Sequence, residues 1–567
     1  SFLRAASTVG AAAAASKVLG LTREMVLAAA FGVGPVMTAF SYASLIPTFC
    51  LSLLGGVNGP FHSTIASVLS KSAEKDAEKG AERSDQNAAR EQQELLVLVS
   101  ALVALASIVA AVLIFLCARP IIDLLAPGLS FPPAALASDP SAVASFALTR
   151  HVAISQLQQM APCIALAPLI GIGFGTLSAR GEFAIPSLSP SLSSLSVLVG
   201  IAFYFTLCRW SPLASPQREI IGGTCLAVSF TAGALLQWLI QLAAEICSAP
   251  APQRVAATAP PEAAKSAVQV VVTTAQPEDL SSAAAAAPAA APPAEAKTAT
   301  APPPPPTTAK TAAPLAPSPS AETTAATAAA SPATPATASH APSWLPLTAL
   351  FARHSEQLRE VFGVLIPATV ASGMLQIATF TDLYFASFLP GTAAALGYAN
   401  LLCMAPLGIL STALLVPLLP LFARLAHPKD RPLLKDSLRR GLVMAMAVTL
   451  PMTAVMLPLA RPIVRTVFQR RSFDASATSL VSSLLSCYLL GSPCYLARDV
   501  LVRLFYSLAD GTTPFLISTF AIAANAVLDF LFVSRWEFGP QGLVLATAAV
   551  NSASAVALLW LAHRRMG

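Results

Sequence analysis

Long apolar runs separated by short polar segments extend along almost the whole chain. Each run is long enough to cross the roughly 30 Å hydrocarbon layer of a bilayer as a helix. Several exceed 25 residues, which predicts helices that tilt, bend or extend beyond the bilayer. The pattern predicts twelve spans, at residues 5–31, 36–70, 93–118, 150–179, 185–208, 219–247, 358–389, 393–424, 437–460, 475–507, 513–534 and 540–562.

A different composition separates the sixth run from the seventh. This segment consists mainly of Ala, Pro, Thr and Ser, with almost no aromatic residue. Proline at this density interrupts helices, and too few apolar side chains are present to offset the entropy lost on ordering. We therefore predict an N-lobe at 1–248, a disordered cytoplasmic linker at 249–342 and a C-lobe at 343–567.

The two lobes resemble each other in sequence. "AFSYASLIP" (39–47) is similar to "ALGYANLLC" (395–403), and "LSARGEFAIPSLSPSL" (177–192) is similar to "YSLADGTTPFLISTF" (506–520). Because each lobe has an even number of spans, both copies enter the membrane from the same side. The predicted fold class is an all-α polytopic membrane protein with two parallel-repeat lobes of six helices, an arrangement that secondary transporters use with the substrate path between the lobes.

Composition agrees with this fold class and argues against an enzyme. Hydrophobic residues make up 55% of the chain and charged residues 11%, whereas a soluble protein carries about 25% charged residues. The cysteines are scattered singly, and no catalytic, metal-binding or nucleotide-binding motif is present, so we expect no cofactor, no metal and no nucleic-acid partner. His62 is the one histidine expected at membrane depth, either titrating in a cavity or packed against neighbouring helices.

Lys and Arg residues concentrate in the loops on the side of the N-terminus. This asymmetry predicts that both termini lie on the cytoplasmic or stromal side. The exception is "ARPIVRTVFQRRSF" (460–473), an Arg-rich segment that the same orientation places on the outer side. Orientation alone does not explain it.

Three charges lie in the first apolar run, within "SKVLGLTREM" (16–25). Lys17 and Glu24 are seven residues apart and share one helical face, Arg23 lies about 100° away, and Gly20 permits a bend. A charge at the centre of a membrane helix costs about 2.5–3.5 kcal/mol on the insertion scale. Two interpretations remain open: an ion-pair network that stabilises the bundle, or a cationic surface on a water-filled cavity that binds an anionic head group. We favour the second.

Ionisable residues in the second lobe are candidates for gating or ion coupling. They are Asp382, Asp499 and Arg498; Asp499 also has a structural alternative, an i,i+4 pair with Arg503. Asp529 is expected close to the outer interface, where water would solvate it.

The motifs together are specific to one family. "SKVLGLTREMVLAAAFGVGPVMTAF", "EFAIPSLSPSL", "LGYANLLCMAPLGILSTALLVPLLPLFARLA", "FDASAT" and "ARDVLVRLFYSLADGTTPF" closely resemble the MurJ/MviN family, the lipid II flippases of the multidrug/oligosaccharidyl-lipid/polysaccharide exporter superfamily. "GGVNGPFHS" and "GYANLL" look most like the cyanobacterial branch. The resemblance covers nearly all of the chain except the linker.

The resemblance implies alternating access, in which a V-shaped cationic cavity between two rocking lobes binds a lipid-linked diphosphate head group. Lys17, Arg23 and Glu24 match the basic, basic and acidic residues that the family uses for head-group binding and gating. The match also places three uncharged residues in the binding set, namely Ser16, Ala28 and Asn400.

Several family charges are absent from this chain. Thr38 replaces an acidic residue, Leu51 and Ser52 replace a pair of arginines, and Asn400 with Leu401 replaces an Asp–Arg pair. The family also implies fourteen helices, whereas the apolar pattern gives twelve. Fewer cationic contacts remain, so Lys17 and Arg23 would be most of the site.

We therefore predict a lipid II flippase, which we expect to be monomeric, surrounded by membrane lipids and driven by the membrane potential or a coupled cation. Two alternatives remain: an exporter of another lipid-linked oligosaccharide or a small organic substrate, and a non-transporting scaffold that recruits partners through the linker. The Ala/Pro/Thr-rich insertion in a cyanobacterial-looking chain favours the inner chloroplast envelope, with a bacterial inner membrane as the alternative.

Overall fold

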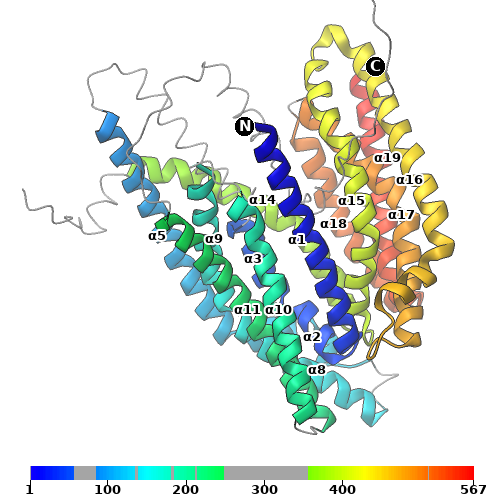
Figure 1. Ribbon diagram of the computed structural model, residues 1–567. Helices are drawn as coiled ribbons and strands as arrows, with labels where there is room; N and C mark the ends of the chain where they lie inside the picture. The colour runs from blue at the N-terminus through cyan, green and yellow to red at the C-terminus, as the bar shows by residue number, and fades with distance from the viewer. Residues whose placement is uncertain are drawn as a thin grey trace, which may run out of the picture. The chain divides into compact units, whose positions relative to one another are not determined.

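The structure is a computed structural model that describes residues 2–55, 85–133, 138–179, 184–210, 214–247, 355–508 and 510–566. Within these residues the chain is helical, and no strand occurs (Figure 1). The first lobe contributes α1 (Phe2–Phe31), α2 (Pro35–Ala43), α3 (Leu45–Gly55), α5 (Asp85–Leu116), α6 (Ala118–Leu125), the 3₁₀ turn η1 (Pro127–Leu129), α8 (Pro140–Met160), α9 (Pro162–Ala179), α10 (Ala184–Trp210) and α11 (Ser215–Cys247). The second contributes α14 (Ser355–Ala386), α15 (Thr392–Arg424), η2 (Pro428–Asp430), α16 (Arg431–Phe468), α17 (Ala475–Ser507), α18 (Thr512–Phe530), the π turn η3 (Leu531–Arg535) and α19 (Pro540–Met566).

The predicted all-helical membrane class is confirmed, but the number of spans is not. Nine helical segments of the described residues are long and apolar enough to cross a membrane, with α8 and α9 counted together as one, or ten if α2 and α3, bent by 42°, count as one span. α1 and α14 lie where spans were predicted, although they are not among these nine. The predicted linker and His62 lie outside the described residues.

Small residues allow the helices of the first lobe to pack closely. α10 contacts α11 along its length, and α11 also contacts α8 and α9. A Cβ atom on Gly233 would lie 2.7 Å from the Cα of Ser193, and one on Gly200 would lie 2.5 Å from the side chain of Ser229. Only glycine permits this approach of α10 and α11, as is typical of membrane helix pairs that associate through small residues.

The second lobe is built around α17. This helix contacts α15, α16 and α19, while α18 packs against α19 and α14 (Figure 1). Its fully buried side chains include Leu485, Leu489, Leu496 and Leu504. α17 therefore forms the apolar centre against which the ionisable residues of the neighbouring helices are positioned.

The sharp turn from α1 into α2 brings the two lobes into contact. Gly32 adopts φ +58°, a conformation that favours glycine, and Pro35 then begins α2. The hydroxyl of Tyr398 in α15 donates to the carbonyl oxygen of Gly32 at 3.3 Å, and the ring of Tyr398 packs against Phe468 and Phe473. We call this end of the helices, where α1 ends, the α1–α2 end.

Candidate functional site

Arg23 and Glu24 form an ion pair on α1. The Nε and Nη2 atoms of Arg23 donate to Oε1 of Glu24 at 3.1 and 2.6 Å, and the two side chains are 28% and 20% exposed. Although the residues are adjacent in sequence, their side chains turn toward each other. The pair keeps a guanidinium and a carboxylate together where neither is fully solvated, which offsets part of the cost of removing them from water.

Lys17 and Ser16 lie nearer the start of α1 and are half-buried. At 1.5 Å per residue, the Cα atom of Lys17 lies about 10 Å along the helix axis from that of Glu24. The helix surface between them is thinly covered: Val18 is 67% exposed, and no other described atom lies within 4 Å of a Cβ placed on Gly20. The α1 surface at Val18 and Gly20 therefore borders open space, whereas Nζ of Lys17 is itself buried.

The packing of α1 changes one turn after Glu24. Ala28 is fully buried in the core shared by the two lobes, and its carbonyl oxygen accepts a hydrogen bond from the N–H of Gly32 at 2.8 Å. The charged residues of α1 thus lie where an open helix face meets a closed one. Ala28 belongs to the closed part.

The positions at which family charges are absent have ordinary structural surroundings. Thr38 is buried and donates to the carbonyl oxygen of Val33 at 3.2 Å. Leu51 packs against an apolar cluster of the first lobe, and Ser52 is exposed. None of these side chains supplies a charge to the site.

Asn400 and Asp382 line one cavity of about 390 Å³. Its walls come from α2, α3, α14, α15, α17 and α19, and its polar lining includes Ser41, Tyr495 and Asn551. The structure therefore brings together two of the predicted site residues that belong to different helices of the second lobe. The volume is at the lower end of what small-molecule sites enclose, and amides and hydroxyls dominate its polar groups.

Asp382 also belongs to a polar cluster that joins three helices. Nδ2 of Asn525 donates to Oδ1 of Asp382 at 2.7 Å and to Oδ2 of Asp529 at 2.9 Å. Thr547 on α19 is 3.3 Å from Oδ1 of Asn525 and 3.5 Å from Oδ2 of Asp382. The cluster contains two carboxylates and no Lys or Arg.

The environment of Asp529 differs from the sequence prediction. Its side chain is fully buried and not solvated, because Asn525 and Asp529 are four residues apart on α18 and both face α14 and α19. Oδ1 of Asp529 has no hydrogen-bond partner among the described residues. Two neighbouring carboxylates in an apolar interior repel each other, and a proton or a bound cation relieves that repulsion.

Sequence reasoning missed Asn525 and Thr547. The i,i+4 spacing in "NAVLD" (525–529) was the available signal, because it places an amide and a carboxylate on one helical face. The contribution of Thr547 from another helix depends on tertiary packing.

Arg498 and Asp499 lie on α17, away from this cluster. Nη2 of Arg498 donates to Oγ of Ser518 on α18 at 3.0 Å, which ties two helices of the second lobe together. His62, the remaining predicted residue, lies outside the described residues.

Comparison with known proteins identifies the family. The family model for "Lipid II flippase MurJ" matches residues 27–274 and 335–567. The "Probable lipid II flippase MurJ" of Synechocystis sp. is 36% identical over 564 residues, which covers 99% of this chain and 81% of the relative. A protein of the same description from Rhizobium tropici is 29% identical over 218 residues, 38% of this chain and 40% of that protein.

Two solved structures share the fold. One is "Lipid II flippase MurJ, inward closed conformation", with a TM-score of 0.61 and 18% identity over 98% of this chain and 87% of that one. The other is an inward-facing multidrug resistance MATE family transporter of the MOP superfamily, with a TM-score of 0.60 and 12% identity over 97% of this chain and 94% of that one. Because the family model spans most of both lobes and the Synechocystis relative matches almost the whole chain, this chain belongs to the lipid II flippase MurJ family, as its motifs predicted.

Proposed function

We propose that this protein moves a lipid-linked peptidoglycan precursor, lipid II, across a membrane by alternating access. The observation that carries the proposal is the placement of Lys17, Arg23 and Glu24 on one stretch of α1, beside the open surface at Val18 and Gly20, in a chain of the MurJ family. A diphosphate needs cationic donors at membrane depth, and this stretch supplies two of them. No covalent chemistry is required, so the protein acts as a transporter and not as an enzyme.

Each residue has a distinct role in this proposal. Lys17 and Arg23 bind the diphosphate through charge-assisted hydrogen bonds. Glu24 holds the Arg23 guanidinium through Oε1 until a phosphate oxygen replaces the carboxylate, which couples binding to the release of an ion pair. Ser16 and Ala28 lie on the same helix, and Asn400 supplies an uncharged amide for the sugar or peptide part of the head group.

The polar cluster of the second lobe would bind the coupled cation. Asp382, Asn525, Asp529 and Thr547 converge from α14, α18 and α19, with Nδ2 of Asn525 between the two carboxylates, and hard cations such as Na⁺ prefer the oxygen ligands that these side chains carry. Asp382 also lines the cavity that contains Asn400, so a bound cation or proton would alter the wall of the substrate path. His62, Arg498 and Asp499 are further proposed gating residues.

The proposed setting follows from charge and resemblance. Both termini are on the cytoplasmic or stromal side, which places the α1–α2 end on the outer side. The membrane is the inner chloroplast envelope or a bacterial inner membrane, and the working unit is a monomer.

Rescue of a bacterium depleted of its own lipid II flippase tests the proposal. We expect the wild-type chain to restore growth and Lys17→Ala and Arg23→Ala to fail at equal membrane abundance. Arg439→Ala is the matched control, because this arginine is exposed on α16. Equal rescue by all variants would exclude the proposed cationic site, and loss of rescue only on deletion of residues 249–342 would support the scaffold alternative.

A further inference from the structure

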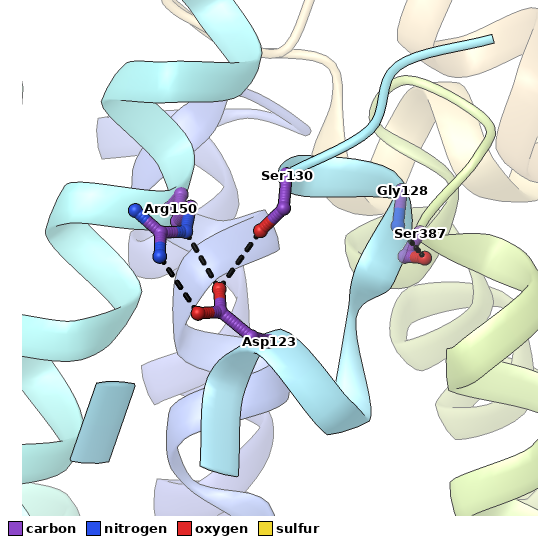
Figure 2. Close-up of polar contacts among 5 residues, drawn as sticks. All are labelled: Asp123, Gly128, Ser130, Arg150 and Ser387. Atoms are coloured by element: carbon purple, nitrogen blue, oxygen red, sulfur yellow. Dashed lines mark hydrogen bonds and ion pairs between the residues drawn. The ribbon is translucent and has the colours of Figure 1, made fainter. Parts of the chain in front are cut away.

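The loop between the third and fourth spans of the first lobe is fixed by an ion pair. Oδ1 of Asp123 on α6 accepts hydrogen bonds from Nε of Arg150 at 2.6 Å and from Oγ of Ser130 at 2.8 Å (Figure 2). Oδ2 of Asp123 accepts a third hydrogen bond, from Nη2 of Arg150 at 2.7 Å. Arg150 belongs to α8 and Ser130 follows η1. The Asp123 carboxylate precedes the turn at residues 126–130 and connects α8 to Ser130, the last residue of that turn. We call this turn strap A.

Strap A contacts the second lobe through Gly128. Its N–H donates to Oγ of Ser387 at 2.9 Å, in the turn between α14 and α15 (Figure 2). Ser387 is 2% exposed, and a Cβ atom on Gly128 would collide with the backbone carbonyl of Ser387. The backbones are so close that only glycine fits at position 128. A contact this close is sensitive to the position of strap A, which the bonds of Asp123 fix.

A second turn makes the converse contact. Residues 469–473, which we call strap B, follow α16 and belong to the Arg-rich segment. The N–H of Ser472 donates to the carbonyl oxygen of Ala29 at 3.2 Å, and its Oγ donates to that of Ala30 at 2.9 Å. A Cβ atom on Gly32 would collide with the carbonyl oxygen of Ser472.

The arginines of strap B hold it in this position. Nη2 of Arg470 donates to the carbonyl oxygen of Thr466 at 2.8 Å, which caps the end of α16. Arg471 adopts φ +50°, and its guanidinium carbon lies 4.9 Å from the centre of the Phe205 ring on α10 of the first lobe. Attraction between the guanidinium and the face of the ring holds strap B against the first lobe.

The two straps are related by the internal repeat. Strap A follows the third span of the first lobe and contacts the turn after the first span of the second. Strap B follows the third span of the second lobe and contacts the turn after the first span of the first. In both contacts the glycine belongs to the first lobe and the serine to the second.

We propose that straps A and B are a reciprocal pair that closes the α1–α2 end of the molecule, and that Asp123 with Arg150 are positioning residues that set the stability of the closed state through strap A. The inference rests on the proposed alternating-access function, since that mechanism requires this end to open in turn. Beside strap A lies a cavity of about 310 Å³ lined by Thr38, Thr149 and Ser387. Thr38 is buried in its wall, and opening of the straps would expose this side chain to solvent.

Thiol labelling of purified protein in nanodiscs, without lipid II, tests the proposal. Thr38→Cys reports on the cavity beside strap A, and Ala555→Cys, buried in a separate apolar cluster of the second lobe, reports on general loosening. The measured quantity is the labelling rate with a membrane-impermeant maleimide, above that of the same protein without the introduced cysteine. We expect Asp123→Asn to raise the rate at Thr38→Cys about five- to tenfold and leave the rate at Ala555→Cys unchanged.

Two further variants sharpen the test. Asp139→Asn is the matched control: Asp139 caps α8 at the same end through Ser141 and, among the described residues, makes no bond to the second lobe, so it should change neither rate. Ser387→Ala should act like Asp123→Asn, and the double variant should label no faster than either single one, because both act through one contact. An unchanged rate at Thr38→Cys, or an equal rise at Ala555→Cys, would overturn the proposal.

The assay separates this inference from the transport function. Labelling needs no substrate, so failure of strap A to control opening would leave the rescue experiment with Lys17 and Arg23 unaffected. Conversely, failure of rescue would leave a strap-dependent change in labelling intact.

Discussion

Asp529→Asn is expected to stabilise the protein in the absence of a coupled cation and to abolish its response to that cation. The physical reason is the repulsion between Asp529 and Asp382. Their two oxygens accept from the same nitrogen, at 2.7 and 2.9 Å, so they lie no more than about 5.6 Å apart. At an effective dielectric constant of about 20, two unit charges at this separation repel by about 3 kcal/mol.

The substitution also preserves shape. An Asn at 529 keeps an oxygen toward Nδ2 of Asn525 and removes one of the two charges. The gain from the substitution is smaller than this repulsion, because a proton on either carboxyl already removes the repulsion. We expect a rise in midpoint of about 1 °C in sodium-free buffer, which corresponds to roughly 1 kcal/mol for a chain of this length.

Thermal unfolding in nanodiscs, with sodium replaced by N-methylglucamine, is the assay. Wild-type protein should gain about 2.7 kcal/mol when sodium is 100 times its Kd, and Asp529→Asn should gain little. Asp436→Asn is the control, since this exposed carboxylate on α16 pairs with Arg440. A lower midpoint for Asp529→Asn without sodium, or an unchanged sodium response, would refute the reasoning; a wild-type response to pH and not to sodium would identify the proton as the ligand.

Three further outcomes follow from the charged contacts. Glu24→Gln should free the Arg23 guanidinium and tighten binding of a soluble diphosphate analogue about three- to tenfold by calorimetry, whereas weaker binding would contradict a competing role for Glu24. The side-chain hydrogen bond from Arg150 lowers the pKa of Asp123, so the ionised carboxylate stabilises the fold above about pH 4 and this stabilisation is lost as pH falls further. The difference in unfolding midpoint between wild type and Asp123→Asn should therefore shrink below about pH 4. A difference that stays constant would exclude the ion pair as its cause. Arg471→Ala should raise labelling at the α1–α2 end about two- to fivefold, with exposed Arg440→Ala as the unaffected control.

The helical membrane class and its family could be predicted from the sequence because both depend on local pattern. Apolar runs of membrane length give helices wherever they occur, and the internal repeat shows directly as "AFSYASLIP" and "ALGYANLLC". The number of spans is harder, because residues 35–55 form two helices bent by 42° where the pattern gave one run. The hydropathy pattern reports the length and composition of an apolar run, and it does not show whether the helix bends within that run.

The cluster around Asp382 shows which part of a site is beyond local pattern. Asp529 was visible in the sequence, but its burial depends on the rotation of α18 against α14 and α19. That rotation is set by packing along the whole helix, and 100° of difference would place the carboxylate in lipid or water. The same limit applies to Thr547, an ordinary threonine until α19 places it beside Asn525.

The Arg-rich segment at 460–473 shows how an exception to a sequence rule can be informative. Positive residues are retained on the inner side because transfer of their charge through the membrane is unfavourable, so arginines in an outer loop should be lost unless the folded protein uses them. Arg470 caps α16 and Arg471 lies over Phe205, a residue of the other lobe and far away in sequence. No periodicity connects these positions, but in the proposed orientation the arginines lie on the outer side, which marks strap B as a segment whose tertiary contacts retain them. The corresponding loop of the first lobe achieves its contact with one balanced pair, Asp123 and Arg150, and therefore violates no rule. In a transporter built from two repeats, a loop that breaks the charge rule in one repeat thus points to the corresponding loop of the other repeat. That loop is the place to look for a second closing contact, which its composition does not show.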